Sequence, residues 1–268
     1  MKPLTAFTAA ARRDIRGVFF DIDDTLTTAG RLTAGAYSAM ERLAGAGVMT
    51  VPITGRPAGW CDHFARMWPV EGVVGENGAF YFRYDRVQRR MLRRFFASPE
   101  ERSEARERLE RLRQIILRDV PGSAVASDQG YRATDLAIDY CEDVEPLPAA
   151  AVDRIVALFE QAGATAKVSS IHVNGWFGHY DKLTMTQILM RESFAVDLDA
   201  DRERYVFVGD SPNDAPMFGY FPNSVGVANV AAFGATLAAQ PAYICSRPCG
   251  EGFTELADAL LAARAAGR

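Results

Sequence analysis

Three predicted strands end in polar residues of types that can do chemistry. The segments are Asp-Ile-Asp-Asp-Thr at 21–25, Thr-Gly-Arg at 54–56 and Gly-Asp-Ser-Pro-Asn-Asp at 209–214. Carboxylates can act as nucleophiles, exchange protons and bind hard divalent cations. Ligands of parallel α/β sheets bind beyond the carboxyl ends of the strands, so we expect all three segments to face one crevice.

The elements that would position these segments alternate along the chain. Short apolar runs predict strands, and helical spacing of apolar residues predicts helices between them. Strands are expected at 17–20, 48–53, 72–75, 205–208, 223–228 and 242–244, and helices at 33–46, 182–194 and near 253–260. This alternation predicts an α/β fold, a Rossmann-like core with a parallel sheet.

The middle of the chain follows a different pattern. Two strands joined by a turn are expected within 79–96, and a helix to residue 118 starts at a capping box of Ser98 and Glu101. A strand at 136–140, a helix at 152–159 and a strand at 166–174 follow. We therefore predict a core formed by residues 1–80 and 180–268, with an inserted α+β cap at 81–179.

Four segments in order resemble the motifs of the haloacid dehalogenase (HAD) superfamily. They are Asp-x-Asp-x-Thr at 21–25, Thr-Gly-Arg at 54–56, the isolated Lys182, and Gly-Asp-x-x-Asn-Asp at 209–214. The cap and the Gly-Glu-Asn-Gly-Ala segment at 75–79 resemble the type-2B-capped subgroup, which is Cof-like or sucrose-phosphate-phosphatase-like. The resemblance covers nearly the whole chain and implies a HAD core.

The resemblance implies roles for the first motif. Asp21 would attack phosphorus and form an aspartyl-phosphate, which splits one difficult hydrolysis into two displacements. Asp23 would protonate the leaving alcohol and then activate water. An acid/base Asp at this position favours a phosphatase or a phosphomutase over the dehalogenases and ion pumps of the superfamily.

The resemblance also implies a Mg²⁺ site, because several carboxylates beside a phosphate need a cation. The expected ligands are the carboxylates of Asp21 and Asp210 and the backbone carbonyl of Asp23. Asp214 would support this site or orient Lys182. The groups expected to hold the phosphoryl oxygens are Thr54, Gly55, Lys182 and Asn213. Lys182 has the weakest support in the sequence, since lysines are usually solvated.

The last predicted cap strand alternates and offers contacts for a leaving group. If Ile171 and Val173 pack under the cap helices, the opposite face carries Ser170, His172 and Asn174. With Trp176, these three residues are candidates for hydrogen bonding to and stacking on a sugar. The alternative is an exposed polar sheet face, with Trp176 packed at the hinge.

Composition limits the partners. The 268 residues are 49% hydrophobic and 24% charged, and the net charge of −4 argues against general nucleic-acid binding. No stretch has the apolar length of a membrane span, so we expect a cytoplasmic protein without a membrane partner. The four cysteines are too few and scattered for a disulfide scaffold. A monomer or small homo-oligomer acting on a small molecule is expected.

The sequence therefore predicts a Mg²⁺-dependent phosphatase for a small phosphate monoester, with a sugar phosphate favoured. Two alternatives stay open. One is a sugar phosphomutase similar to phosphomannomutase, which has the same paired Asp residues. The other is a non-catalytic regulator that binds a sugar phosphate.

Overall fold

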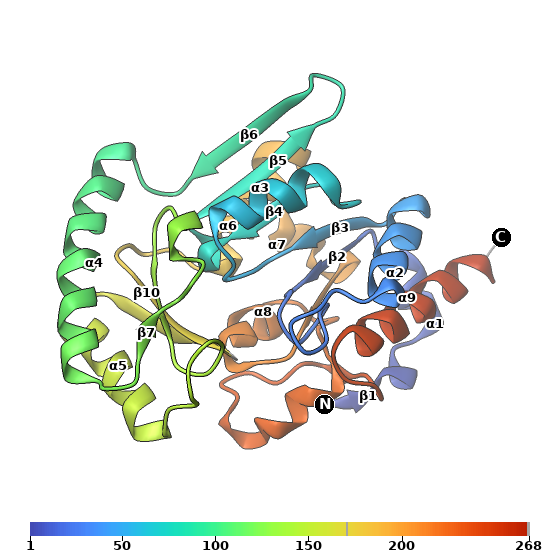
Figure 1. Cartoon of the computed structure of the whole chain (residues 1–268). Helices are drawn as coiled ribbons and strands as arrows, with labels where there is room; N and C mark the ends of the chain where they lie inside the picture. The colour runs from blue at the N-terminus through green and yellow to red at the C-terminus, as the bar shows by residue number, and fades with distance from the viewer. Residues whose placement is uncertain (170, 267–268) are drawn as a thin grey trace.

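The core is built on a six-stranded parallel sheet (Figure 1). The computed structural model describes residues 1–169 and 171–266. The strand order is β1 (Lys2–Pro3), β13 (Tyr243–Ile244), β12 (Val225–Gly226), β11 (Tyr205–Gly209), β2 (Gly17–Phe20) and β3 (Met49–Pro52). Each neighbouring pair is parallel. The predicted α/β fold with a Rossmann-like parallel sheet is confirmed.

Helices cover both faces of this sheet, so its strands are buried on both sides. Val18 and Phe20 of β2 face one apolar cluster, and Phe19 between them faces another. The first face carries α1 (Ala9–Asp14), α2 (Ala34–Gly45), α3 (Ala58–Met67) and α9 (Cys249–Ala265). The second carries α6 (Lys182–Phe194), α7 (Leu198–Asp201) and α8 (Ala215–Tyr220). Strand alternation with a period of two explains this division.

Short 3₁₀ helices lie mainly at the connections. They are η1 (Leu4–Ala6), η2 (Glu76–Gly78), η3 (Gln129–Tyr131), η4 (Arg202–Arg204), η5 (Pro212–Asp214), η6 (Ala228–Ala232) and η7 (Gly234–Thr236). Within the described ranges, no helix combines the length and the apolar character that crossing a membrane would require.

A β-hairpin projects from the core at the top of Figure 1. Its strands, β5 (Phe80–Asp85) and β6 (Arg90–Phe95), match the two strands expected within 79–96. β5 pairs antiparallel with β4 (Val73–Gly75), and Val74 bridges to Ile53 beyond β3. Pairing thus joins the hairpin to the core side of the molecule. We propose that the cap begins near α4 instead of at residue 81.

The cap lies beside the core, at the left of Figure 1. α4 (Pro99–Asp119) starts at the predicted capping box, in which Ser98 N donates to Glu101 Oε2 at 2.8 Å. The cap sheet has the order β7 (Ala124–Val125), β8 (Leu136–Asp139), β10 (His172–Trp176) and β9 (Thr165–Val168), and is antiparallel. α4 and α5 (Ala149–Gln161) pack on one face. On the other face, His172 and Asn174 line a cavity together with core residues.

The strand expected at 166–174 is two strands, so that prediction is wrong. β9 and β10 form a hairpin in which Val168 pairs with Val173. The Ser169 side chain explains the turn, because its Oγ accepts hydrogen bonds from Ile171 N at 3.3 Å and His172 N at 3.0 Å. Ile171 thus belongs to the turn and does not pack under the cap helices. Ser170 lies outside the described residues.

Gly175 joins the cap sheet to α5 through direct contact with Phe159. A methyl group at position 175 would lie 2.1 Å from a carbon of the Phe159 ring. Overpacking a core costs about 1–3 kcal/mol, so we expect Gly175→Ala to lower the free energy of unfolding by about that amount. Urea titration followed by circular dichroism measures this change. Gly130→Ala is the control, since no heavy atom lies within 4 Å of its added methyl. Equal stability of the two variants would contradict the packing described.

Candidate active site

Three buried carboxylates meet at the carboxyl edge of the core sheet. Asp21 follows β2, and its N–H continues the ladder by donating to Val208 O at 3.0 Å. Because β2 and β11 are paired and parallel, Asp21 lies beside Asp210. Asp21, Asp210 and Asp214 each offer an oxygen within 4.8 Å of the others. The expected convergence of the first and last segments is present.

Lys182 supplies positive charge to this acidic cluster. It is the first residue of α6, whose N-cap Asp181 accepts a hydrogen bond from Thr184 N at 2.7 Å. Its Nζ lies 2.7 Å from Asp214 Oδ1 and 3.2 Å from Asp21 Oδ1. Burial opposes the charge of Lys182, but Asp21 and Asp214 outweigh this effect and hold its pKa above the usual value. Lys182 is therefore a buried cation and not a solvated surface lysine.

One lysine does not balance three buried carboxylates. Burial raises the pKa of Asp21 to about 7, although Lys182 acts in the opposite direction. Burial also raises the pKa of Asp210 well above its usual range, with a further contribution from Asp214 and Asp21. The excess of acidic oxygen makes this cluster suitable for a hard divalent cation such as Mg²⁺.

Asp210 and Asp214 are fixed by different partners. Asp210 Oδ1 accepts from Thr25 Oγ1 at 3.0 Å, and its Oδ2 accepts from Asn229 Nδ2 at 3.3 Å. Asp214 Oδ2 accepts from Asp210 N at 3.1 Å, while its Oδ1 takes the Lys182 contact. A Cβ at Gly209 would lie 2.4 Å from Asp214 Oδ2, so glycine is needed there. Asp214 thus orients Lys182 in this geometry.

A small cavity lies between these residues and the cap sheet. The core contributes Asp21, Asp23, Gly55, Arg56, Ser211 and Asn213, and the cap contributes Arg132, Ser169, Ile171, His172 and Asn174. Six residues expected from the sequence therefore meet here: Asp21, Asp23, Gly55, Asn213, His172 and Asn174. Thr54 is buried outside this lining, where its Oγ1 accepts from Arg56 N at 3.0 Å.

Trp176 does not line the cavity, so the stacking prediction for it is wrong. It is buried in the apolar core cluster, and its ring stacks on Tyr180 with centroids 5.6 Å apart. Trp176 shares a sheet face with His172 and Asn174 but lies two residues further along β10. Each such step moves a side chain by about 6.6 Å, which brings it over apolar core residues.

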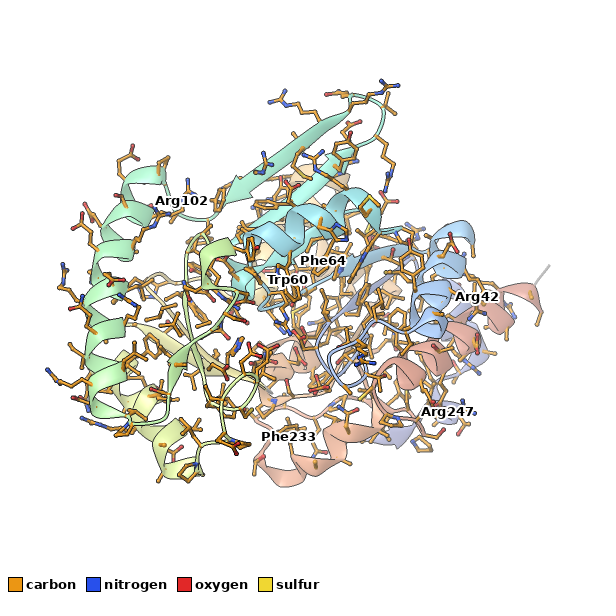
Figure 2. All side chains as sticks on the ribbon, in the orientation of Figure 1. Arg42, Trp60, Phe64, Arg102, Phe233 and Arg247 are labelled. Carbon is orange, nitrogen blue, oxygen red and sulfur yellow. The ribbon has the colours of Figure 1, made fainter. Side chains whose placement is uncertain are left out.

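Arg56 was visible in the Thr-Gly-Arg segment, but no role was predicted for it. Its guanidinium binds the Asp23 carboxylate through Nε at 3.0 Å and Nη2 at 2.8 Å. Nη2 also lies 3.2 Å from Glu142 Oε1, and Nη1 lies 3.5 Å from Asp128 Oδ2. The Trp60 ring covers the group at 4.6 Å, on the part of α3 near the cap (Figure 2). Arg56 therefore connects Asp23 to the cap.

Arg132 is a second arginine that sequence reasoning missed. Its side chain is 1% exposed and lies 3.0 Å from both Asp128 Oδ1 and Asp135 Oδ2. It also donates to Gly55 O of the core at 3.0 Å. Asp128 and Asp135 lie within four residues of Arg132 in the sequence, but this segment is not an α-helix, so its spacing gave no regular signal of ion pairing.

Glu142 and His172 form a pair within the cap. His172 Nε2 lies 2.8 Å from Glu142 Oε2, while the other oxygen of Glu142 contacts Arg56. The hydrogen bond with His172, together with the charge of Arg56, lowers the pKa of Glu142 to about 2. Glu142 thus contacts a core cation and a cap imidazole at once.

Glu76 attaches the cap to the core at another point. This fully buried carboxylate accepts hydrogen bonds from Ala58 N at 2.9 Å in the core, and from Ala133 N at 2.8 Å and Thr134 N at 2.7 Å in the cap. Thr134 also borders a cavity of about 460 Å³. This cavity is lined in part by the two segments in which the chain passes between core and cap, near Phe96 and near Tyr180. Glu76 therefore fixes the cap close to these two connecting segments.

Comparison with known proteins gives structural matches. No family model matches the chain, and no curated protein matches it. The sucrose-phosphatase of Synechocystis sp., solved with sucrose and phosphate, is 14% identical, with a TM-score of 0.64, covering 92% of this chain and 98% of that one. A haloacid dehalogenase-like hydrolase from Bacteroides thetaiotaomicron is 14% identical, with a TM-score of 0.63 and coverages of 91% and 98%. Another protein of that organism, described among HAD phosphatases, is 16% identical, with a TM-score of 0.61 and coverages of 98% and 98%. The chain therefore has the fold of the haloacid dehalogenase-like hydrolases.

Proposed function

We propose that this chain is a HAD-superfamily phosphatase that hydrolyses a small phosphate monoester with Mg²⁺. The observation that carries the proposal is the position of Asp21. Its carboxylate lies 3.2 Å from the buried Lys182 and beside Asp210, and it faces a cavity that Asp23 also lines. A nucleophile, a cation and an acid/base candidate are thus within one site.

The reaction would proceed in two displacements. In the first, an Asp21 oxygen attacks phosphorus, the bond from phosphorus to the leaving oxygen breaks, and Asp23 donates a proton to that oxygen. In the second, Asp23 takes a proton from water, whose oxygen attacks the phosphorus of the aspartyl-phosphate. The bond between Asp21 and phosphorus then breaks and phosphate leaves. Asp21 and Asp23 return to their starting states.

The phosphoryl group gains negative charge that the site must balance. Lys182 would face its oxygens, with the hydroxyl of Thr54, the backbone N–H of Gly55 and the amide of Asn213 as hydrogen-bond donors. When Mg²⁺ is bound by Asp21, Asp210 and the backbone carbonyl of Asp23, it supplies further charge neutralisation. The excess of buried acidic oxygen described above supports this ligand set.

Arg56 would position the acid/base residue. Its two hydrogen bonds to Asp23 fix the carboxyl group at the cavity wall. Because Arg56 also contacts Asp128 and Glu142, this orientation depends on the position of the cap. Cap closure and correct placement of Asp23 would therefore occur together.

Substrate entry would require the cap to move. The cavity has a volume of about 20 Å³, which is room for about one water molecule. His172 and Asn174 would contact the leaving group once the cap has closed over the substrate. A sugar phosphate suits these polar groups, and the Synechocystis neighbour with sucrose and phosphate supports this choice. We propose a sugar phosphate as the substrate.

Asp21→Asn tests the nucleophile. Asparagine keeps the shape of the side chain but is a poor nucleophile, so we expect phosphate release from sugar phosphates and an aryl phosphate to fall at least about a thousandfold. Colorimetric phosphate assays with Mg²⁺ measure the loss. Asp24→Asn removes a neighbouring carboxylate that is absent from the cavity lining and is expected to keep most of the activity.

The same assay separates the alternatives for function. Activity that appears only with a bisphosphorylated activator would indicate a mutase. Correctly folded wild-type protein that binds sugar phosphate without releasing phosphate would indicate the regulator.

Removal of metal tests the carboxylate cluster. Asp210→Asn removes one of three buried like charges, so without metal we expect the variant to melt at a higher temperature than wild type. Mg²⁺ should raise the melting temperature of wild type, since a ligand at about 100 times its Kd adds about 2.7 kcal/mol of stability. Differential scanning fluorimetry in EDTA and in excess MgCl₂ measures both effects.

For the variant, the Mg²⁺-dependent rise should be lost. The exposed Asp153 on α5 gives the control Asp153→Asn, which should respond to Mg²⁺ as wild type does. Equal Mg²⁺ responses of Asp210→Asn and wild type would exclude Asp210 as a ligand.

A further inference from the structure

Two guanidinium groups line the cavity, and both are already paired. Arg56 uses its in-plane edges for Asp23, Glu142 and Asp128 at 2.8 to 3.5 Å. One face of the same group is covered by the Trp60 ring. An incoming anion would therefore have to displace a protein carboxylate from Arg56.

Arg132 is held even more tightly. Its side chain is 1% exposed and is paired with Asp128 and Asp135, each at 3.0 Å, with Gly55 O as a further acceptor. Asp128 and Asp135 are buried as well, at 6% and 3% exposure. Arg132 borders the cavity, but all three of its guanidinium nitrogens already donate to these protein acceptors.

Lys182 is committed to two core carboxylates and is not part of the cavity lining. It contacts Asp21 and Asp214 and is 4% exposed. In the proposed reaction its charge serves the transferred phosphoryl group. It cannot also neutralise a charge on the leaving group, which lies on the cap side.

The charged groups around these two arginines are net negative even without the proton donor Asp23. The two guanidinium groups are paired with the carboxylates of Asp128, Asp135 and Glu142, which lie behind the cavity lining. His172 adds a positive charge only when it is protonated, and its Nε2 already lies 2.8 Å from Glu142. A second anion placed beside these groups would meet net repulsion, and water screens this repulsion only in part because Asp128 and Asp135 are buried.

Neutral hydrogen-bonding groups complete the wall. Asn174 Nδ2 donates to Asp135 at 2.9 Å, which leaves its amide oxygen to accept from a hydroxyl. Asn213 Oδ1 accepts from Ser211 Oγ at 2.8 Å, which leaves two amide N–H groups, one for the phosphoryl oxygens as proposed above and one to donate to a hydroxyl. Together these groups can accept hydrogen bonds from the hydroxyls of an uncharged alcohol and donate hydrogen bonds to them.

We propose that this site selects phosphate esters whose leaving group is uncharged and bears hydroxyls, and that it rejects leaving groups with a second anionic group. The inference rests on the proposed phosphatase function and names the substrate class of that same site. It also disfavours the mutase alternative, because a bisphosphate would place its second phosphate against this negative wall.

Matched pairs of phosphate esters test the proposal. Glucitol 6-phosphate and 6-phosphogluconate differ only in a hydroxymethyl or a carboxylate group far from the phosphate. Glycerol 3-phosphate with 3-phosphoglycerate, and glucose 6-phosphate with glucose 1,6-bisphosphate, are further pairs. We expect kcat/KM for the neutral member of each hydrolysed pair to exceed that of the anionic member at least about tenfold.

Glu142→Gln tests whether the carboxylate cluster causes this selection. The substitution keeps the shape of Glu142 but removes one negative charge from the wall, so the neutral-to-anionic ratio of kcat/KM should fall severalfold. The ratio cancels any general loss of activity in the variant. Glu145→Gln removes the same charge from an exposed position three residues away and should leave the ratio unchanged.

An aryl phosphate assayed in parallel separates this inference from the proposed function. If the aryl phosphate is hydrolysed but both members of the pairs react equally, or no pair member reacts, the selection is overturned and the phosphatase function stands. A preference that Glu142→Gln leaves unchanged overturns its assignment to this cluster. Absence of hydrolysis of every ester, the aryl phosphate included, overturns both proposals.

Discussion

The arrangement of the core depends on one unfavourable requirement, the burial of three carboxylates next to one another. Asp21, Asp210 and Asp214 each offer an oxygen within 4.8 Å of the others at the sheet edge. Desolvation and repulsion by neighbouring carboxylates both oppose the ionised forms of Asp21 and Asp210. Lys182 offsets part of this cost and must be placed beside them. That lysine starts α6, only six residues after the last cap strand ends. The return of the chain from the cap is therefore tied to the charge balance of the site.

A second charged cluster connects this edge to the cap. Arg56 holds Asp23 on the core side and contacts Asp128 and Glu142 on the cap side. An ion pair of this kind is stable only while all its partners remain in place, because a buried charge without a partner is costly. Displacement of the cap would therefore leave Arg56 and Asp23 with fewer partners than in the closed arrangement. The proposed acid/base residue would then be ordered only when the cavity excludes water.

Local patterns were enough to predict the core and the convergence of acidic residues at its edge. Strand ends, helix starts and the capping box at Ser98 depend on residues close in sequence, and the structure contains them near the expected positions. The convergence of Asp21 with Asp210 also followed from a general rule, since parallel strands meet at one edge. In the cap, alternation correctly put His172 and Asn174 on one face, toward the cavity.

Contacts between distant segments could not be predicted in the same way. Nothing near residues 80–95 indicates that the hairpin pairs with β4, and the turn that divides β9 from β10 depends on the side chain of Ser169. Trp176 has the same alternation as His172, and only the packing of the cap on the core decides that it is covered by apolar residues. Arg56 and Glu142 are 86 residues apart and meet because the cap folds over the core. The role of a side chain that connects core and cap is set by its partner in the other part. Such a role can be recognised only when the packing of the cap on the core is known.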